Sequence, residues 1–460
     1  MKAKYYLKLL FCFLLISPFF LHFSMAKNAN KTNAKTIRTK YDYFSTHNKE
    51  DINSNNFEKG KDPFQPYQTG KSPQILKDFG EEVKDGVRLR KVVFYSREVQ
   101  TATGKDTSKI YAVIARPAKS GRYPGLLVLH GGGGFAEIDK AKKWAKQGYI
   151  ALLLDEPGIA NPEKAPFSSG PWKKFAYGES RFIVIPDITN STIFDGVLSA
   201  VQGLYLLRSQ PGVIKGKIGI VGISWGGYLT TIVSGLANKM VNASFSVFGS
   251  GFYDEGSLFL KELDKMSTAD RATWLKYLDA GRRSKAIKTH FFIAAAANDN
   301  WFYPPAVMAT LRSIKGPVNN LFSPNSSHKI ELPGGTTGAN PEQPGWLSME
   351  QVYFDYFLKG IGQPLPKIQE IKTEKTSSGN VLVRFKVSSL LSVSIAQISY
   401  SSIVVGWTER KWETVPAVKS GNGWYMVEVP AKELRHSFDC FATISDSRPV
   451  SVSSYLIRYE

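Results

Sequence analysis

Residues 217–228 read KIGIVGISWGGY, an apolar strand that runs through a glycine-flanked serine into a helical pattern. A serine on such a tight strand-to-helix turn is pushed out over the carboxyl edge of a sheet. Gly222 and Gly226 are required because side chains at these positions would collide with the neighbouring strand and helix. The stretch predicts Ser224 as a nucleophile. The competing interpretation is an ordinary glycine-rich turn in which the serine only caps a helix.

Short apolar runs lie on both sides of this turn and alternate with segments of helical spacing. The runs are LRKVVFYS (89–96), IYAVIARP (110–117), GLLVLH (125–130), YIALLLD (149–155) and HFFIAAAA (290–297). One helical segment spans residues 193–207, a second follows Ser224, and a last one is predicted over residues 346–359, ended by Gly360. This alternation predicts an α/β fold, a mostly parallel sheet with helices on both faces.

Changes in composition divide the chain into four parts. Residues 1–26 have a basic start, an apolar segment and a small-x-small end, which predicts a cleavable signal peptide and a secreted or periplasmic protein. An uncleaved anchor is the alternative. Residues 27–75 show no sustained period and are predicted to be a flexible leader. Residues 76–364 form the predicted catalytic domain. Residues 365–460 contain alternating β-prone segments and turns and are predicted to form a small β-sandwich.

Composition restricts the classes of partner. The formal charge is +20 at pH 7, but no nucleic-acid motif accompanies it, so we interpret it as a surface property. No apolar run is a convincing membrane span, and we expect no stable membrane insertion. Cys12 lies in the signal segment, so the mature chain forms no internal disulfide, and Cys440 is predicted to be buried. The sequence leaves the oligomeric state open.

A glycine-rich loop, HGGGG (130–134), directly follows the strand GLLVL. Consecutive glycines let a backbone amide approach a substrate closely, and this is where a hydrolase would place half of its oxyanion hole. We assign the hole to the amide of Trp225 together with that of Gly132 or Gly133. A phosphate-binding loop is the alternative, but the Lys-Ser/Thr ending of that motif is missing.

The order serine, acid, histidine is completed by Asp299 and His328. Asp299 follows the run HFFIAAAAN and would emerge at the carboxyl end of a strand. His328 lies in the polar loop SPNSSHK, expected between two helices, where its imidazole could take the proton of Ser224. Asp254 and Glu255 remain alternative acids, because they also follow a strand.

Other parts of the site are less determined by the sequence. No histidine and carboxylate cluster has ligand spacing, so we expect neither a metal nor another cofactor. Trp301 and Tyr303 follow the predicted acid, and Trp172 lies in an insertion after the fourth apolar run; all three are candidates for substrate binding. Core or loop packing is the competing interpretation for each aromatic.

The stretch from about residue 90 to 364 resembles the dienelactone hydrolase and acetyl xylan esterase branch of the α/β-hydrolase fold. The resemblance rests on LHGGGG, GISWGGY, the AND before Trp301 and the helix end FLKG. The chain also resembles the prolyl-oligopeptidase-type catalytic domain and the PhoPQ-activated pathogenicity-related proteins. The latter share a small C-terminal β domain, here including ERKWETVPA. Dienelactone hydrolases use cysteine as nucleophile, so Ser224 favours the esterase side of the branch.

These observations predict a secreted serine carboxylic-ester hydrolase that deacetylates a glycan or a small acylated molecule through an acyl-enzyme. One alternative is a serine peptidase of prolyl-oligopeptidase type, which the lack of a propeller-length repeat region before residue 90 disfavours. The other is a non-catalytic carbohydrate- or envelope-binding protein that kept the fold.

Overall fold

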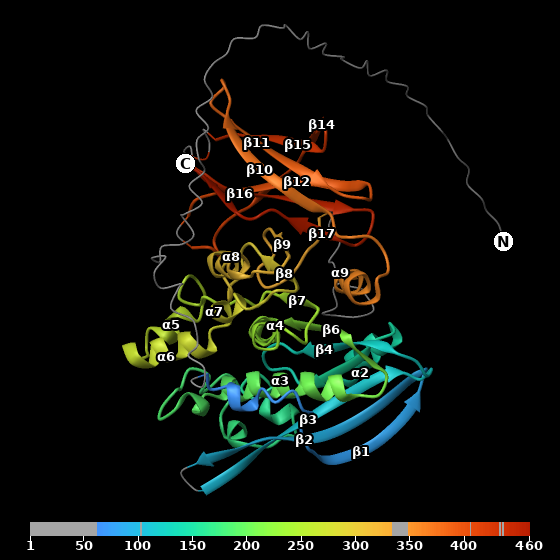
Figure 1. The fold of residues 1–460 in the computed structure, drawn as a ribbon. Coiled ribbons are helices and arrows are strands. Elements are labelled where there is room, and N and C mark those ends of the chain that lie inside the picture. The colour runs from blue at the N-terminus through green and yellow to red at the C-terminus, as the bar shows by residue number, and fades with distance from the viewer. Residues whose placement is uncertain (1–61, 102–103, 334–347, 405, 432–433, 435–436) are drawn as a thin grey trace, which may run out of the picture. The chain divides into compact units, whose positions relative to one another are not determined.

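The computed structural model of the chain describes residues 62–101, 104–333, 348–404, 406–431, 434 and 437–460 (Figure 1). The predicted signal peptide lies outside these residues, as does the predicted leader up to residue 61. Both stay predictions, and so does the proposed domain boundary after residue 364. Among the described residues, no helix has the length and apolar character needed to cross a bilayer.

A nine-stranded sheet organises the first three-quarters of the chain. Its order is β1-β2-β3-β5-β4-β6-β7-β8-β9, with antiparallel pairing from β1 to β5 and parallel pairing from β5 to β9. The bounds are β1 Ile75–Lys84, β2 Val87–Thr101, β3 Gly104–Pro117, β4 Tyr123–Leu129, β5 Ile150–Leu154, β6 Val213–Ile223, β7 Ala243–Val247, β8 His290–Ala296 and β9 Val318–Ser323. The mostly parallel sheet predicted from the apolar runs is confirmed.

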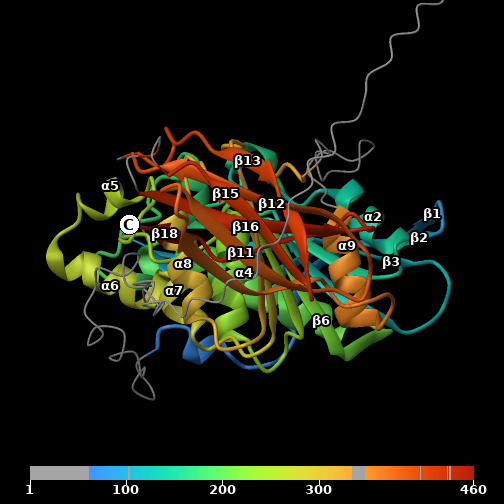
Figure 2. The same ribbon diagram turned by 90° about the horizontal axis from the view of Figure 1, so that it is seen from above.

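Helices cover both faces of this sheet, as predicted. The bounds are α2 Ile138–Lys146, α3 Thr192–Ser209, α4 Trp225–Leu236, α5 Leu260–Leu263, α6 Thr268–Leu278, α7 Ala280–Ser284, α8 Pro304–Ser313, α9 Ser348–Phe354 and the π-helical turn η6 Asp355–Lys359. On one face α2 meets α9, where the rings of Trp144 and Phe354 lie 5.9 Å apart. Figure 2 shows α4, α7 and α8 on the opposite side of the strands from α2 and α9.

Short 3-10 turns complete the connections, at η2 Gln65–Tyr67, η3 Pro162–Lys164, η4 Pro171–Lys174 and η5 Ile188–Asn190. Two of the helices predicted from the sequence begin and end close to the expected residues: α3 ends at Ser209, and η6 ends where Gly360 takes a left-handed φ of 73°. Glycine adopts this conformation at no steric cost, which explains the stop.

Two antiparallel sheets form the C-terminal part, as the alternating segments predicted. One has the order β10-β11-β15-β14, and the other contains β13-β12-β16-β17, with β18 also paired to β16. The bounds are β10 Lys367–Lys375, β11 Val381–Ser388, β12 Val393–Ser402, β13 Glu413–Pro416, β14 Val418–Gly421, β15 Trp424–Val429, β16 Phe438–Asp446, β17 Ser451–Ser453 and β18 Ile457–Tyr459. Their inner faces share one apolar core, to which Phe385, Ile398 and Cys440 belong.

The C-terminal sheets lie on the β9 side of the large sheet, away from β1 (Figure 1). Every residue of β16 is buried, because its outer face packs on residues of β8, β9 and α8. Phe322 of β9 lies 5.7 Å from Phe441 of β16, measured between ring centroids. The backbone amide of Phe322 also donates to Ser453 Oγ at 3.0 Å. The two parts therefore meet through apolar contacts and hydrogen bonds.

Two expectations from the sequence need correction. The loop of His328 does not lie between two helices, since the strand β9 ends at Ser323 directly before it. The sequence VNNLFS conceals this strand because Asn320 interrupts its apolar pattern; in the fold its amide donates to the carbonyl of Ser454 at 3.1 Å. The end of the predicted leader is packed, with Phe64 2% exposed and stacked 4.5 Å from Phe194. A single aromatic anchor has no period that sequence analysis can detect.

Candidate active site

Ser224 lies at the junction of β6 and α4, on the turn predicted from the sequence. Its backbone has φ 58° and ψ −118°, a combination that residues other than glycine rarely adopt. A methyl group at Gly222 would lie 2.2 Å from the carbonyl oxygen of Gly226, and one at Gly226 would lie 2.4 Å from that of Leu129. The expected need for both glycines is confirmed. The turn holds Ser224, partly exposed, at the carboxyl end of β6, with its amide donating to Val247 O at 2.8 Å.

The loop HGGGG follows β4 and lies against this turn. A methyl group at Gly131 would be 3.7 Å from the Cβ of Ser224. The amide of Gly133 donates to the carbonyl of Ile159 at 2.8 Å, whereas that of Gly132 has no hydrogen-bond partner within the described part of the chain. The amide of Trp225 opens α4 and has no partner within the helix. Of the two glycines that the sequence left open, Gly132 is therefore the one with an available donor.

His130 at the base of this loop is a structural residue. Its Nε2 accepts from the amide of Glu156 at 3.3 Å, and its Nδ1 donates to the carbonyl of Gly131 at 2.8 Å. Burial lowers the pKa of His130 to about 4, and burial raises the pKa of Glu156 well above its usual range. The imidazole is neutral at pH 7 and fixes the loop, because both of its nitrogens are occupied.

Asp299 and His328 lie together at the carboxyl edge of the sheet. Asp299 follows β8 and is fully buried, and its Oδ2 lies 2.9 Å from Nδ1 of His328. Its Oδ1 accepts the amides of Trp301 at 2.7 Å and Phe302 at 3.0 Å, so both carboxylate oxygens have partners. With Nδ1 facing a carboxylate, the tautomer of His328 that leaves Nε2 free to accept a proton is favoured.

One of the two alternative acids, Asp254, is engaged elsewhere. Asp254 forms a two-point ion pair with Arg282, at 2.9 and 2.7 Å, in the segment after β7. Arg282 also approaches Asp279 at 3.5 Å. The carboxylate bonded to His328 is that of Asp299, in agreement with the order read from the sequence.

Residues 110–276 match the model of the dienelactone hydrolase family. Over this segment the chain is similar to the α/β-hydrolases of that family. The matched segment includes the HGGGG loop and the Ser224 turn, and ends before Asp299 and His328.

The proteins to which this chain is similar include esterases. The chain is 24% identical over 256 residues to the acetyl esterase Axe7A of Xylanibacter ruminicola, an alignment that covers 52% of this chain and 56% of that protein. The chain thus spans about half the length of this relative. Acetyl xylan esterase 1 of Thermoanaerobacterium sp. is 18% identical with a TM-score of 0.48, covering 59% of this chain and 89% of that one. The acetyl xylan esterase of Paenibacillus sp. R4 is 17% identical with a TM-score of 0.46, covering 58% and 87%.

Aromatic rings surround the imidazole of His328. Phe248, directly after β7, has its ring 4.1 Å from that of His328, and the buried Phe302 lies 6.2 Å away in a stacked orientation. Trp301 is 41% exposed, with its ring 6.5 Å from the imidazole, and is the most open of these aromatics. Tyr303 caps α8 and is partly buried. Phe248 is the contact that sequence reasoning missed; its only signal is its place after an apolar strand.

A second group lies over the oxyanion loop. The Tyr177 hydroxyl occupies the space above Gly132, only 1.6 Å from where a methyl group on that glycine would stand. The guanidinium of Arg181 lies 4.6 Å from the Tyr177 ring centroid and 4.3 Å from that of Trp225. Its Nε donates to Gly158 O at 2.6 Å, and burial lowers the pKa of Arg181. No sequence pattern pointed to Arg181, because it comes from an irregular insertion.

Trp172, a third candidate for substrate binding, is part of a small core. It is 2% exposed and packs with Ala160 and Ala165. This placement corresponds to the packing role that the sequence left open for each aromatic.

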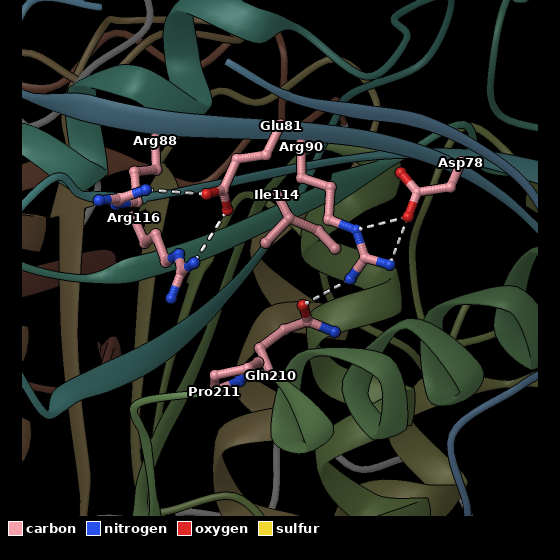
Figure 3. Close-up of a pocket in the computed structure, with 8 residues that line it drawn as sticks. All are labelled: Asp78, Glu81, Arg88, Arg90, Ile114, Arg116, Gln210 and Pro211. Atoms are coloured by element: carbon pink, nitrogen blue, oxygen red, sulfur yellow. Dashed lines mark hydrogen bonds and ion pairs between the residues drawn. The ribbon is translucent and has the colours of Figure 1, made fainter. Parts of the chain in front are cut away.

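A charged cavity of about 210 Å³ is lined by residues of β1, β2 and β3 and by Gln210 and Pro211 (Figure 3). Gln210 and Pro211, which border it, precede β6, whereas Ser224 follows that strand. Its arginines are paired: Arg90 binds Asp78, and Arg88 and Arg116 both bind Glu81. The cavity is thus separate from the candidate active site, and its paired charges suit a structural role.

Proposed function

We propose that the chain is a serine carboxylic-ester hydrolase that deacetylates a glycan or a small acylated molecule. The observation that carries this proposal is the 2.9 Å contact between His328 Nδ1 and the buried Asp299, at the same sheet edge as the strained Ser224 turn. An imidazole oriented by a carboxylate and a serine on a tight turn at the same sheet edge are the parts that acyl transfer requires.

The reaction follows from the roles of these side chains. Nε2 of His328 takes the proton of Ser224 Oγ as the oxygen attacks the ester carbonyl, while Asp299 stabilises the resulting imidazolium. The amides of Trp225 and Gly132 donate to the oxygen that becomes negative. His328 then returns the proton to the leaving alcohol. In a second round a water molecule, activated by the same imidazole, releases the acid.

The acetyl group and a sugar-like alcohol are supported by two separate observations. The curated relative is named as an acetyl esterase. In this chain, Trp301 presents an exposed indole beside His328, and exposed aromatic faces stack well on pyranose rings. Together with the predicted signal peptide, these points favour an exported enzyme acting on acetylated glycans.

The test compares the wild-type chain with Ser224→Ala and with Ser402→Ala, a control at an exposed serine of β12. We expect wild type and Ser402→Ala to release p-nitrophenol from acetyl and butyryl esters, with the acetyl ester faster. Ser224→Ala should lose activity by a factor on the order of 10³ or more. A serine-directed fluorophosphonate should label Ser224, as read by peptide mass spectrometry.

Two outcomes would change the proposal. The absence of both hydrolysis and labelling in the wild type would overturn it in favour of a binding protein. Labelling of Ser224 without hydrolysis of any ester, but with cleavage of peptide substrates, would replace the esterase with a peptidase.

A further inference from the structure

Asn325, three residues before His328, forms a two-point contact with the C-terminal part of the chain. Its Nδ2 donates to the carbonyl of Trp412 at 2.7 Å, and its Oδ1 accepts the amide of the same residue at 2.9 Å. A primary amide is a side-chain group that can both donate to the carbonyl and accept from the N–H of one residue in this way. Asn325 also has a φ of 55°, a conformation that asparagine tolerates better than most residues.

Asn298, directly before Asp299, joins the same contact. Its Oδ1 accepts the backbone amide of Asn325 at 2.8 Å, and its Nδ2 donates to the carbonyl of Arg410. Asn298 is 7% exposed. The two asparagines thus connect two places in the chain, one just before Asp299 and one just before His328, to a single segment, residues 410–412.

This segment is firmly held by β16. The Arg410 guanidinium binds Asp439, a fully buried carboxylate that Arg458 also contacts at 2.7 and 2.9 Å. Trp412 is 4% exposed, and its ring centroid lies 5.1 Å from that of Phe441. Residues 410–412 therefore form a rigid support rather than a loose loop.

We propose that Asn325 is a positioning residue through which the C-terminal sheets hold the His328 loop in its productive place. This inference rests on the proposed function, because it assigns a role within the same site. Asn325 touches neither Asp299 nor His328 in any contact described, and it acts through the backbone that carries the imidazole. Asn298 fixes the other partner of the pair to the same support.

The geometry explains why such a support would matter. Two residues directly before the histidine also constrain the loop. Ser327 has a left-handed φ of 51°, and Ser326 Oγ donates to Pro324 O at 2.9 Å. A loop with left-handed residues needs outside contacts to keep one conformation. Displacing a reacting group by about 1 Å costs on the order of 10²-fold in rate.

The test uses Asn325→Asp and Asn325→Gly in the full chain. The aspartate keeps the acceptor for the Trp412 amide but loses the donor to its carbonyl, whereas the glycine tolerates the positive φ and loses both bonds. We expect kcat for p-nitrophenyl acetate to fall about tenfold in Asn325→Asp and further in Asn325→Gly, with KM changed by less than about twofold.

Asn320→Ala is the matched control. Asn320 also ties β9 to the C-terminal sheets by a side-chain donor, to Ser454 O, but it lies before the loop. We expect Asn320→Ala to lower the melting temperature while kcat stays within about twofold of the wild type.

The outcomes separate this inference from the proposed function. A wild-type chain with neither ester hydrolysis nor phosphonate labelling contradicts the proposed function itself. An active wild type together with Asn325 variants of unchanged kcat contradicts the positioning role alone. A kcat that falls in all three variants in proportion to their melting temperatures also contradicts it, because stability alone would then explain the loss.

Discussion

The backbone of Ser224 is strained, and a few neighbouring residues hold it in that conformation. A residue in a sparsely populated φ/ψ region costs about 1–3 kcal/mol, and its surroundings must enforce it. Here the enforcement comes from the hydrogen bond to Val247 and from the close packing of Gly222 and Gly226. The strain is therefore local to the place where the proposed chemistry needs an exposed hydroxyl.

The acid of the candidate triad can be tested at this scale by Asp299→Asn. An amide at this position cannot hold the imidazole in the tautomer that accepts a proton at Nε2. We expect kcat to fall by a factor on the order of 10³ to 10⁴, the size of effect known for this change in Ser-His-Asp triads. The measurement is steady-state hydrolysis of p-nitrophenyl acetate.

Asp254→Asn serves as the control, because Asp254 is one of the two alternative acids, with Glu255, that the sequence left open, and it is paired with Arg282. This variant should lose stability with little change in kcat. The reverse result, with a large loss of kcat in Asp254→Asn and a small one in Asp299→Asn, would assign the acid to the segment after β7.

The residues that could be predicted from the sequence are those with a positional rule. Ser224 follows from the glycine pattern, and His328 and Asp299 from chain order and strand ends. Phe248 and Arg181 could not be predicted, because a ring packed on an imidazole or a cation over an indole depends on tertiary proximity. The choice of Gly132 over Gly133 likewise needed the hydrogen bond from Gly133 to Ile159.

At the scale of elements, α9 carries a buried carboxyl group that makes its packing sensitive to pH. Glu350 is 6% exposed, and burial raises its pKa to about 8 despite the nearby Lys140 and Lys143. The folded chain then keeps a proton that the unfolded chain releases above its ordinary pKa of about 4.5. The contribution of this group to stability is greatest below pH 4.5 and is lost as the pH rises towards 8.

Glu350→Gln should remove this dependence. The amide resembles the protonated carboxyl group in shape but cannot ionise, so the variant should gain stability relative to the wild type as the pH rises. We expect melting temperatures to be similar near pH 5 and the variant to be higher by a few degrees near pH 8, measured by thermal unfolding. Parallel melting curves at both pH values would show that Glu350 titrates normally.

The elements found from the sequence are those whose apolar runs are buried on both faces. β4 and β5 are fully or almost fully buried, and their runs are continuous. β1 was not predicted, because it is an edge strand with nine of its ten residues exposed and its sequence therefore has no apolar pattern. β9 was not predicted because Asn320 interrupts its apolar pattern and bonds to the C-terminal sheets, a contact that the local sequence does not reveal.

At the scale of the molecule, the C-terminal sheets complete a core that the large sheet begins. A cluster that contains Phe291, Met308 and Phe322 from the large sheet and its helix also contains Trp412 and Phe441. Separating the two parts would expose these rings to water, at about 25 cal/mol for each Å² of apolar surface. The described part of the chain, between residues 62 and 460, should accordingly unfold as a unit, although the pattern of the sequence changes near residue 365.

Phe441→Ala tests this cooperativity. Phe441 is fully buried between Phe322 and Trp412, so its truncation should cost about 3–5 kcal/mol through lost packing and the cavity left behind. We expect a single calorimetric transition in the wild type and a single, lower one in the variant, with esterase activity lost at the same temperature. Two transitions, with only the first lowered and activity surviving it, would mean that the large sheet folds independently and that its contacts through Asn325 are dispensable for stability.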